Sequence, residues 1–408
     1  MDSSLDVDRR SFLIGGAGAA AAVAVASPGG TALAQDAAPK VKAALPKYAD
    51  WKDASALIVH SDKTLEMKRE EFGNSLITPE SKLYIRNNIN PPDASVIANR
   101  DSWKVEFGGV KYPKSLTVAE LKTLGVVTIA TVLQCSGNGR KYFQDQVVST
   151  NQKITGTPWT VGAAGCVVWT GVPLKSVVEA LGGIADGAKF ITGTGGETLP
   201  DGLDPLSLIV ERSVPLDTLD NVILAWDVNG SPISLAHGGP LRMIVPGYSG
   251  VNNVKYIRAL VFTPKQTEAK IQKTNYRMHP LDRKATSDDP AVWAMNVRSW
   301  ITTPLTSAKS GALQITGLAF GGINALAKVE VSTDGGTTWK DASLSGPNLG
   351  RFAWRQFTFP AKLAAGAYKV VCRATDSEGK VQPKDTEING GGYLHNGWQG
   401  PGIDLSVT

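Results

Sequence analysis

The sequence predicts an α+β region at about residues 45–284, followed by a β-sandwich of immunoglobulin type at 285–408. Two observations predict this division. Before residue 280, capped helical segments alternate with strand-like runs, whereas after about residue 300 short alternating runs are separated only by turns. About 370 residues remain once an amino-terminal leader is set aside, which is enough for two ordinary domains with cores of their own.

Two helices are expected in the first region. Thr117 and Glu120 form a capping-box pattern ahead of a short helix that ends at Gly125. Pro173 opens a second helix, whose apolar residues recur at helical spacing before the glycine pair 182–183 ends it.

A lone thiol follows the strand-like run 126–133, whose β-branched and aliphatic residues predict a buried strand. Gly137 and Gly139 favour a tight turn directly afterwards, so Cys135 is expected at the end of a rigid strand. Arg140 places positive charge nearby, which favours the thiolate. At this point a metal ligand, a nucleophile and a small buried core residue all remain open for Cys135.

The second region reads as strands joined by turns. Asp334-Gly335-Gly336 is a hairpin signal between two strand-like runs. The runs with the clearest alternation are 314–318, 328–332, 355–359 and 368–372.

The amino terminus carries an export signal at residues 1–34. Arg9 and Arg10 form a twin-arginine pattern, an apolar run follows at 14–26, and small residues at 32–34 offer a cleavage site. The apolar run is too short to span a membrane, and no other stretch is long enough. The sequence therefore predicts a periplasmic protein that is exported already folded, as cofactor-bearing proteins often are.

Charge and cysteine usage exclude several classes of protein. The formal net charge of +5 is spread along the chain without a dense basic block, which argues against nucleic-acid binding. Three cysteines are too few for a disulfide framework, and Cys166 and Cys372 lie in strand-like patterns typical of core residues. The sequence contains no Cys-x-x-Cys-His motif, so no covalently attached haem is expected. The histidines are too scattered to predict a zinc site; they are His60, His237, His279 and His395.

A series of separated motifs resembles the sulfite oxidase family of molybdenum enzymes, most closely bacterial sulfite dehydrogenases without a fused haem domain. The resemblance covers nearly all of the chain after the leader, including the sandwich, which mediates dimerisation in that family. The motifs are Tyr84-Ile85-Arg86-Asn87-Asn88, Leu133-Gln134-Cys135-Ser136-Gly137-Asn138, Trp159-Thr160-Val161-Gly162-Ala163-Ala164-Gly165, Asp227-Val228-Asn229-Gly230, His237-Gly238-Gly239-Pro240-Leu241-Arg242, Val245-Pro246-Gly247-Tyr248 and Asn253-Val254-Lys255.

The resemblance implies a molybdenum–molybdopterin cofactor, whose dithiolene supplies two sulfurs while one protein cysteinate completes the set. Cys135 matches that ligand, and a soft thiolate suits such a metal centre. The implied catalytic residues are Arg86, Arg140, Tyr276 and Trp159. The implied cofactor-binding residues, besides Cys135, are Tyr84, Asn87, Asn88, His237, Arg242, Asn253 and Lys255.

Three positions depart from the family pattern and thin the positive lining of the substrate pocket. Asn88 stands where many members have His, and Gly139 where some have a second Arg. Gly391 stands where many members place a pocket Arg from the second domain. Arg355 or Lys384 is a candidate replacement for that charge.

The expected function is oxidation of sulfite to sulfate, with water supplying the oxygen. Since no haem is expected in the chain, the electrons would pass singly to an external c-type cytochrome, and the enzyme is expected to be a homodimer. Three alternatives remain: a sulfane dehydrogenase subunit of a sulfur-oxidising multienzyme system, a molybdopterin-dependent reductase, and a non-catalytic oxyanion-binding module.

Overall fold

The computed structural model describes residues 44–73 and 75–408. The export signal expected at 1–34 lies outside the described residues. No helix in the described part of the chain is long and apolar enough to cross a membrane.

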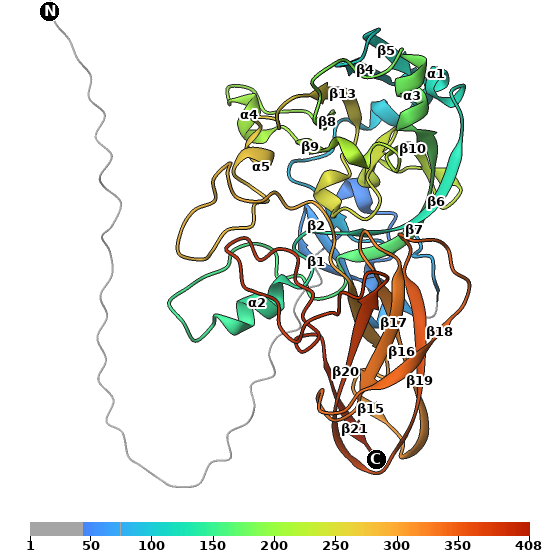
Figure 1. The fold of residues 1–408 in the computed structure, drawn as a ribbon, viewed down its shortest axis with the longest axis vertical. Coiled ribbons are helices and arrows are strands. Elements are labelled where there is room, and N and C mark those ends of the chain that lie inside the picture. The colour runs from blue at the N-terminus through green and yellow to red at the C-terminus, as the bar shows by residue number, and fades with distance from the viewer. Residues whose placement is uncertain (1–43, 74) are drawn as a thin grey trace, which may run out of the picture. The chain divides into compact units, whose positions relative to one another are not determined.

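The first region contains three sheets (Figure 1). A small sheet has the order β1-β2-β3, a second has β11-β10-β7-β6 with β12 paired to β10, and a third has β5-β4-β13-β8-β9. Their strands are β1 Leu57–Ser61, β2 Thr64–Met67, β3 Ile85–Arg86, β4 Lys104–Gly108, β5 Lys114–Thr117, β6 Val127–Gln134, β7 Ala164–Pro173, β8 Phe190–Gly195, β9 Glu211–Pro215, β10 Ile223–Val228, β11 Ser231–Pro232, β12 Arg242–Ile244 and β13 Ile257–Thr263.

The α-helices of the described residues are short and belong to the first region. They are α1 Val118–Lys122, α2 Arg140–Gln146, α3 Leu174–Ala180, α4 Pro205–Leu208 and α5 Lys270–Lys273. Single 3-10 turns occur at Lys47–Ala49, Ala54–Ala56, Arg69–Phe72, Ala94–Ile97, Arg100–Ser102, Leu216–Thr218, Leu235–His237 and Gly250–Asn252.

The two predicted helices, α1 and α3, are confirmed together with their end signals. The backbone amide of Glu120 donates to Thr117 Oγ1 at 3.2 Å, and the amide of Thr117 donates to Glu120 Oε2 at 2.7 Å, which is a complete capping box. After α3, Gly182 and Gly183 have φ values of 81° and 98°, a conformation that glycine adopts without strain.

The strand that leads to Cys135 is present as β6, but only its second half is buried. Val126, just before it, is 62% exposed, so the expectation of a fully buried strand is wrong for the first half. The reason is that β6 is the edge strand of its sheet, where β7 is its neighbour among the described strands. Near its carboxyl end the free edge is covered, since the amide of Val132 donates to the carbonyl of Phe352 at 2.8 Å.

The second region is all-β, with the strand order β14-β16-β19-β18-β17-β20-β21-β15. The four alternating runs fall in β16, β17, β19 and β20. The predicted hairpin joins β17 to β18, and Asp334 Oδ1 accepts bonds from the amides of Thr337 and Thr338 in its turn. The strands are β14 Arg298–Thr303, β15 Ser307–Ala308, β16 Gly311–Phe320, β17 Leu326–Ser332, β18 Lys340–Ser345, β19 Arg355–Leu363, β20 Gly366–Asp376 and β21 Ile403–Val407.

The two cysteines predicted to be core residues are both buried, in different apolar clusters. Cys166 lies in a cluster that both regions build, since it also contains Trp300 and Trp354, whereas Cys372 lies in a cluster formed within the second region. Polar contacts join the regions at the end of β6. Arg298 Nη1 donates to the carbonyl of Asn138 at 2.9 Å and to Gln134 Oε1 at 3.2 Å, so the second region supports the loop that follows Cys135.

Candidate active site

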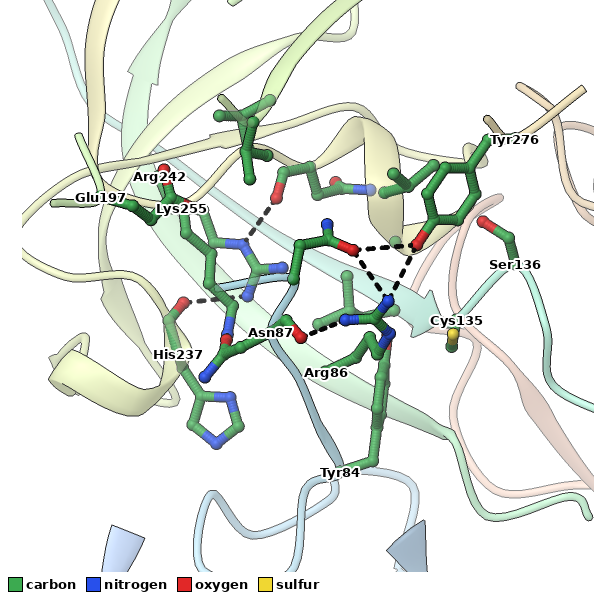
Figure 2. Close-up of a pocket in the computed structure, with 17 residues that line it drawn as sticks. Tyr84, Arg86, Asn87, Cys135, Ser136, Glu197, His237, Arg242, Lys255 and Tyr276 are labelled. Carbon is green, nitrogen blue, oxygen red and sulfur yellow. Dashed lines mark hydrogen bonds between the residues drawn. The ribbon is translucent and has the colours of Figure 1, made fainter. Parts of the chain in front are cut away.

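A pocket opens at the carboxyl end of β6, where loops of the first region converge (Figure 2). It encloses about 640 Å³ of space not filled by atoms, part of it open to solvent. Its lining consists of Tyr84, Arg86, Asn87, Asn88, Leu133, Cys135, Ser136, Glu197, Val210, His237, Arg242, Gly250, Val251, Asn253, Val254, Lys255 and Tyr276. The pocket therefore brings together every residue implied by the family resemblance except Arg140 and Trp159.

Cys135 is held rigidly at one end of this pocket. Its amide donates to the carbonyl of Ala163 at 2.9 Å, and its own carbonyl accepts from the amide of Asn138 at 2.9 Å. The side chain of Asn138 closes the turn, because it donates to Gln134 Oε1 and accepts from the amide of Ala163. Cys135 is 7% exposed, and it is the thiol that the described residues present to the pocket.

The other end of the pocket holds cations that bond only to neutral oxygens in the described structure. Lys255 Nζ donates to Asn87 Oδ1 at 2.6 Å and to the carbonyl of Ala236 at 2.7 Å. Arg242 donates to the carbonyls of Asn253 and His237 at 3.1 and 2.9 Å. Charged groups removed from water normally require an opposite charge, so this end is suited to an anion.

Burial and mutual repulsion disfavour the positive charge at this end. Burial, and then the neighbouring cations, hold the pKa of Lys255 well below its usual range. Burial lowers the pKa of Arg242 to about 10. The pKa of His237 is also well below its usual range, because of burial first and then the charges of Lys52, Lys255 and Arg242. A bound anion would oppose these shifts, because a nearby opposite charge favours the charged forms of the cations.

Three buried polar atoms of the pocket lack a hydrogen-bond partner among the described residues: Asn87 Nδ2, His237 Nε2 and Glu197 Oε2. Such atoms are rare in folded proteins unless a ligand or water completes them. They supply donors as well as an acceptor, which fits an organic cofactor with both a phosphate and N–H edges. Together with the Cys135 thiol at the opposite end, this donor set fits molybdopterin carrying molybdenum.

Arg86 lies on the Cys135 side of the pocket (Figure 2). It donates to the carbonyl of Asn87, to Asn88 Oδ1 at 2.8 Å and to the hydroxyl of Tyr276 at 3.5 Å. The pKa of Arg86 is raised, chiefly by its interaction with Tyr276, so the guanidinium stays charged at working pH. Asn88, at the position where many family members have His, contributes a fixed acceptor rather than a titratable group.

Arg140 and Trp159, which the resemblance implies as site residues, do not line the pocket but contact residues around it. Arg140 begins α2, and its guanidinium donates to the carbonyls of Gly391 and Thr157, each at 3.1 Å. Trp159 is fully buried, with its ring centroid 6.3 Å from that of Tyr84 in an edge-on arrangement. These contacts make Arg140 an anchor between the two regions and Trp159 a packing partner of Tyr84.

Neither candidate replacement for the missing second-region arginine reaches the pocket. Arg355 lies on β19 and donates to the carbonyl of Gly346 at 3.3 Å. Lys384 is exposed, and neither residue lines the cavity. The hypothesis that one of them supplies this charge is therefore wrong for the described structure.

Four lining residues belong neither to the sequence motifs nor to the implied site residues: Glu197, Val210, Gly250 and Val251. Ser136 stood inside the Cys135 motif, but its own role gave no separate signal. Gly250 lets two segments approach closely, because a Cβ there would lie 2.8 Å from the Tyr84 hydroxyl and 3.1 Å from the carbonyl of Gln134. Glu197 lies in a glycine-rich loop without periodicity, and burial raises its pKa to about 7.

Two family models match the chain. An oxidoreductase molybdopterin binding domain matches residues 92–271, and a Mo-co oxidoreductase dimerisation domain matches residues 289–404. Among solved structures, the sulfane dehydrogenase SoxCD from Paracoccus pantotrophus shares the fold, with a TM-score of 0.69 and 24% identity over 93% of this chain and 95% of that chain.

Curated relatives extend the match. Human mitochondrial sulfite oxidase is 30% identical over 386 residues, covering 88% of this chain and 68% of the relative. The Drosophila melanogaster enzyme of the same name is 28% identical over 364 residues, covering 84% and 60%, so this chain spans only part of each relative. A Hordeum vulgare nitrate reductase is 31% identical, covering 80% of this chain and 39% of the relative. By its domains, its relatives and its pocket, this chain belongs to the sulfite oxidase family of molybdenum enzymes.

Proposed function

We propose that this protein oxidises sulfite to sulfate at a molybdenum centre held by Cys135. The observation that carries the proposal is one pocket with a rigid thiol and a permanently charged arginine at one end and unpartnered anion-binding groups at the other. Similarity to sulfite oxidases from human and fly supports the choice of substrate.

The proposed reaction converts sulfite and water into sulfate, two protons and two electrons. The bound cofactor supplies the two-electron redox chemistry and the oxygen transfer. Arg86 would bind the sulfite oxyanion through charge-assisted hydrogen bonds and hold it beside Cys135. Asn88 and Tyr276 orient the guanidinium for that task. Its Nη2 atom donates to Asn88 Oδ1 at 2.8 Å and lies 3.5 Å from the hydroxyl of Tyr276.

The electrons would leave one at a time to a separate c-type cytochrome in the periplasm, because no haem-attachment motif occurs in the chain. The second region would form a homodimer, which the match to a dimerisation domain supports. Contacts between β14 and β20, which are not paired by hydrogen bonds, support an immunoglobulin-type sandwich for that region.

The test begins with metal analysis and an absorption spectrum of the purified mature protein, which should contain molybdenum and no haem. Sulfite turnover is then measured with an artificial acceptor and with a c-type cytochrome. The turnover rate with the cytochrome should fall as the ionic strength rises. Absence of molybdenum from active protein, or a strong Soret band, would overturn the proposal. Turnover of protein-bound sulfane sulfur in place of free sulfite would assign the protein to the sulfane dehydrogenases.

A further inference from the structure

A segment of the second region, residues 389–396, lies against the end of the pocket that holds Cys135; we call it the strap. The amide of Leu394 donates to the carbonyl of Ser136 at 2.8 Å, directly beside Cys135. Arg140 holds the strap from the other side through the carbonyl of Gly391. Within the strap, the side chain of Asn389 accepts from the amide of Tyr393 and donates to its carbonyl, both at 2.9 Å. The strap is therefore fixed behind the pocket lining, in contact with Ser136 and with Arg140.

Tyr393 uses this position to clamp Tyr276. The two rings stack, with centroids 5.1 Å apart and planes inclined by 22°. The guanidinium of Arg140 lies 5.4 Å from the centroid of Tyr393, so the arginine of the first region steadies the strap tyrosine. Tyr276 itself has a φ of 50°, which non-glycine residues rarely adopt, and such a conformation persists only where the surroundings enforce it.

Tyr276 in turn contacts the group that is proposed to bind substrate. Its hydroxyl lies 3.5 Å from Arg86 Nη2 and 3.5 Å from Asn88 Oδ1. The contact chain thus runs from the strap through two stacked rings to the guanidinium in the pocket.

Tyr393 also explains the glycine at position 391. A Cβ built on Gly391 would lie 2.0 Å from the ring of Tyr393, so a side chain at 391 and the observed ring position exclude each other. The second region therefore offers the pocket an aromatic brace at the place where a side chain from position 391 would otherwise stand.

We propose that Tyr393 is a positioning residue of the active site, which holds Tyr276 and, through it, Arg86 in the geometry that binds the oxyanion substrate. The inference deepens the proposed function and rests on it. It gives the second region a part in substrate binding beyond dimerisation.

The test compares Tyr393→Leu, which loses the stack, with Tyr393→Phe, which keeps it. Tyr368→Leu is the matched control, because Tyr368 lies on β20, its hydroxyl donates to the carbonyl of Ala364, and it does not line the pocket. A stacked pair contributes enough to change affinity roughly two- to tenfold. We expect Tyr393→Leu to raise the KM for sulfite by that factor with kcat and molybdenum content nearly unchanged, whereas Tyr393→Phe and Tyr368→Leu behave like the wild type.

A second readout does not need turnover. Sulfate should raise the Tm of the molybdenum-loaded wild type and of Tyr393→Phe, and raise it less in Tyr393→Leu. Gly391→Ala should also raise the KM in the wild-type background, because it displaces the Tyr393 ring, but add nothing in the Tyr393→Leu background. If Tyr393→Leu fails to fold, the comparison of Gly391→Ala with the wild type decides.

An unchanged KM and sulfate shift in folded Tyr393→Leu, or additive effects of the two substitutions, would overturn the inference. Equal loss in Tyr393→Phe would also overturn it, because the stack would then not be the cause. If the wild type does not oxidise sulfite, the proposed function fails, while the sulfate shift still judges the role of Tyr393.

Discussion

The two ends of the pocket differ in how far their polar groups are already hydrogen-bonded. We call the end with Lys255 and Arg242 the cofactor end, and the end with Cys135 and Arg86 the substrate end. At the cofactor end, His237, Asn87 and Glu197 leave buried polar atoms without partners, and Lys255 and Arg242 rely on neutral oxygens. At the substrate end, Arg86 has partners for its guanidinium before any substrate arrives.

The difference indicates how long each ligand stays. Unpartnered buried groups and desolvated cations are costly, so the cofactor end gains most from a permanently bound anion. A group that is already satisfied gains less from a ligand, which suits a substrate that must leave as product. The strap adds to this contrast, because it stiffens only the substrate end. Four substitutions can break or sharpen the comparison.

The largest effect is expected at the Cys135 thiol, which lies at the substrate end and is the proposed molybdenum ligand. Cys135→Ser should abolish sulfite turnover while the fold is retained, because it replaces the thiolate ligand with a harder oxygen. Turnover with an artificial acceptor and circular dichroism are the measurements. Cys166→Ala is the matched control and should keep activity, since Cys166 lies in the core away from the pocket. Near wild-type activity in Cys135→Ser would remove Cys135 from the metal site.

At the cofactor end, Lys255→Met should lower the molybdenum and pterin content of the purified protein. It should not lower the unfolding free energy of the cofactor-free protein, because the substitution removes a desolvated charge that bonds only to neutral groups. Metal analysis and denaturant unfolding measure the two quantities separately. Lys104→Met, at an exposed position on β4, should change neither. Full cofactor content in Lys255→Met would end the assignment of this cation to the cofactor.

At the substrate end, Arg86→Gln should raise the KM for sulfite roughly ten- to a hundredfold, since a charge-assisted hydrogen bond contributes about 1.5–3 kcal/mol. Molybdenum content should stay near that of the wild type, which separates this end from the cofactor end. Steady-state kinetics are the measurement, with Arg355→Gln on β19 as the control that should leave the KM unchanged. An unchanged KM in Arg86→Gln would show that this side chain does not hold the substrate.

The smallest effect concerns the pH dependence of the strap. Burial, helped by the charge of Arg298, lowers the pKa of His395 to about 3. The unfolded chain, with a histidine pKa near ~6.5, then binds the proton more readily than the folded protein. Neutral His395 therefore contributes its full stabilisation above about pH 6.5. This contribution is lost as the pH falls from there toward 3, by about 1.4 kcal/mol per pH unit.

When the pH is lowered from 7 to 5, the unfolding free energy of His395→Asn should therefore fall by about 2 kcal/mol less than that of the wild type. Denaturant unfolding at the two pH values measures this difference. Parallel losses in the two proteins would mean that His395 is not kept neutral by its surroundings.

The sequence by itself determined the features that rest on local chemistry. The capping box of Thr117 with Glu120 and the turn at Asp334 require only neighbours within four residues, and both appear where the pattern predicted them. Cys135 at the end of β6 follows from a strand-forming run and a turn that are adjacent in the chain. The expected site residues around Arg86, His237 and Lys255 came from the resemblance of their motifs to the sulfite oxidase family, and these three residues line one pocket.

Only the tertiary structure decided which of these groups face the ligand. Arg140 turns to the carbonyl of a residue 251 positions away, and that bond makes it an anchor of the strap rather than part of the pocket lining. Tyr393 stacks on Tyr276, which lies 117 positions earlier in the chain (393 − 276), and Glu197 is buried by segments with which it shares no pattern. Burial, stacking and the partner of a long side chain depend on which distant segments pack together, and a local pattern carries no information about that packing.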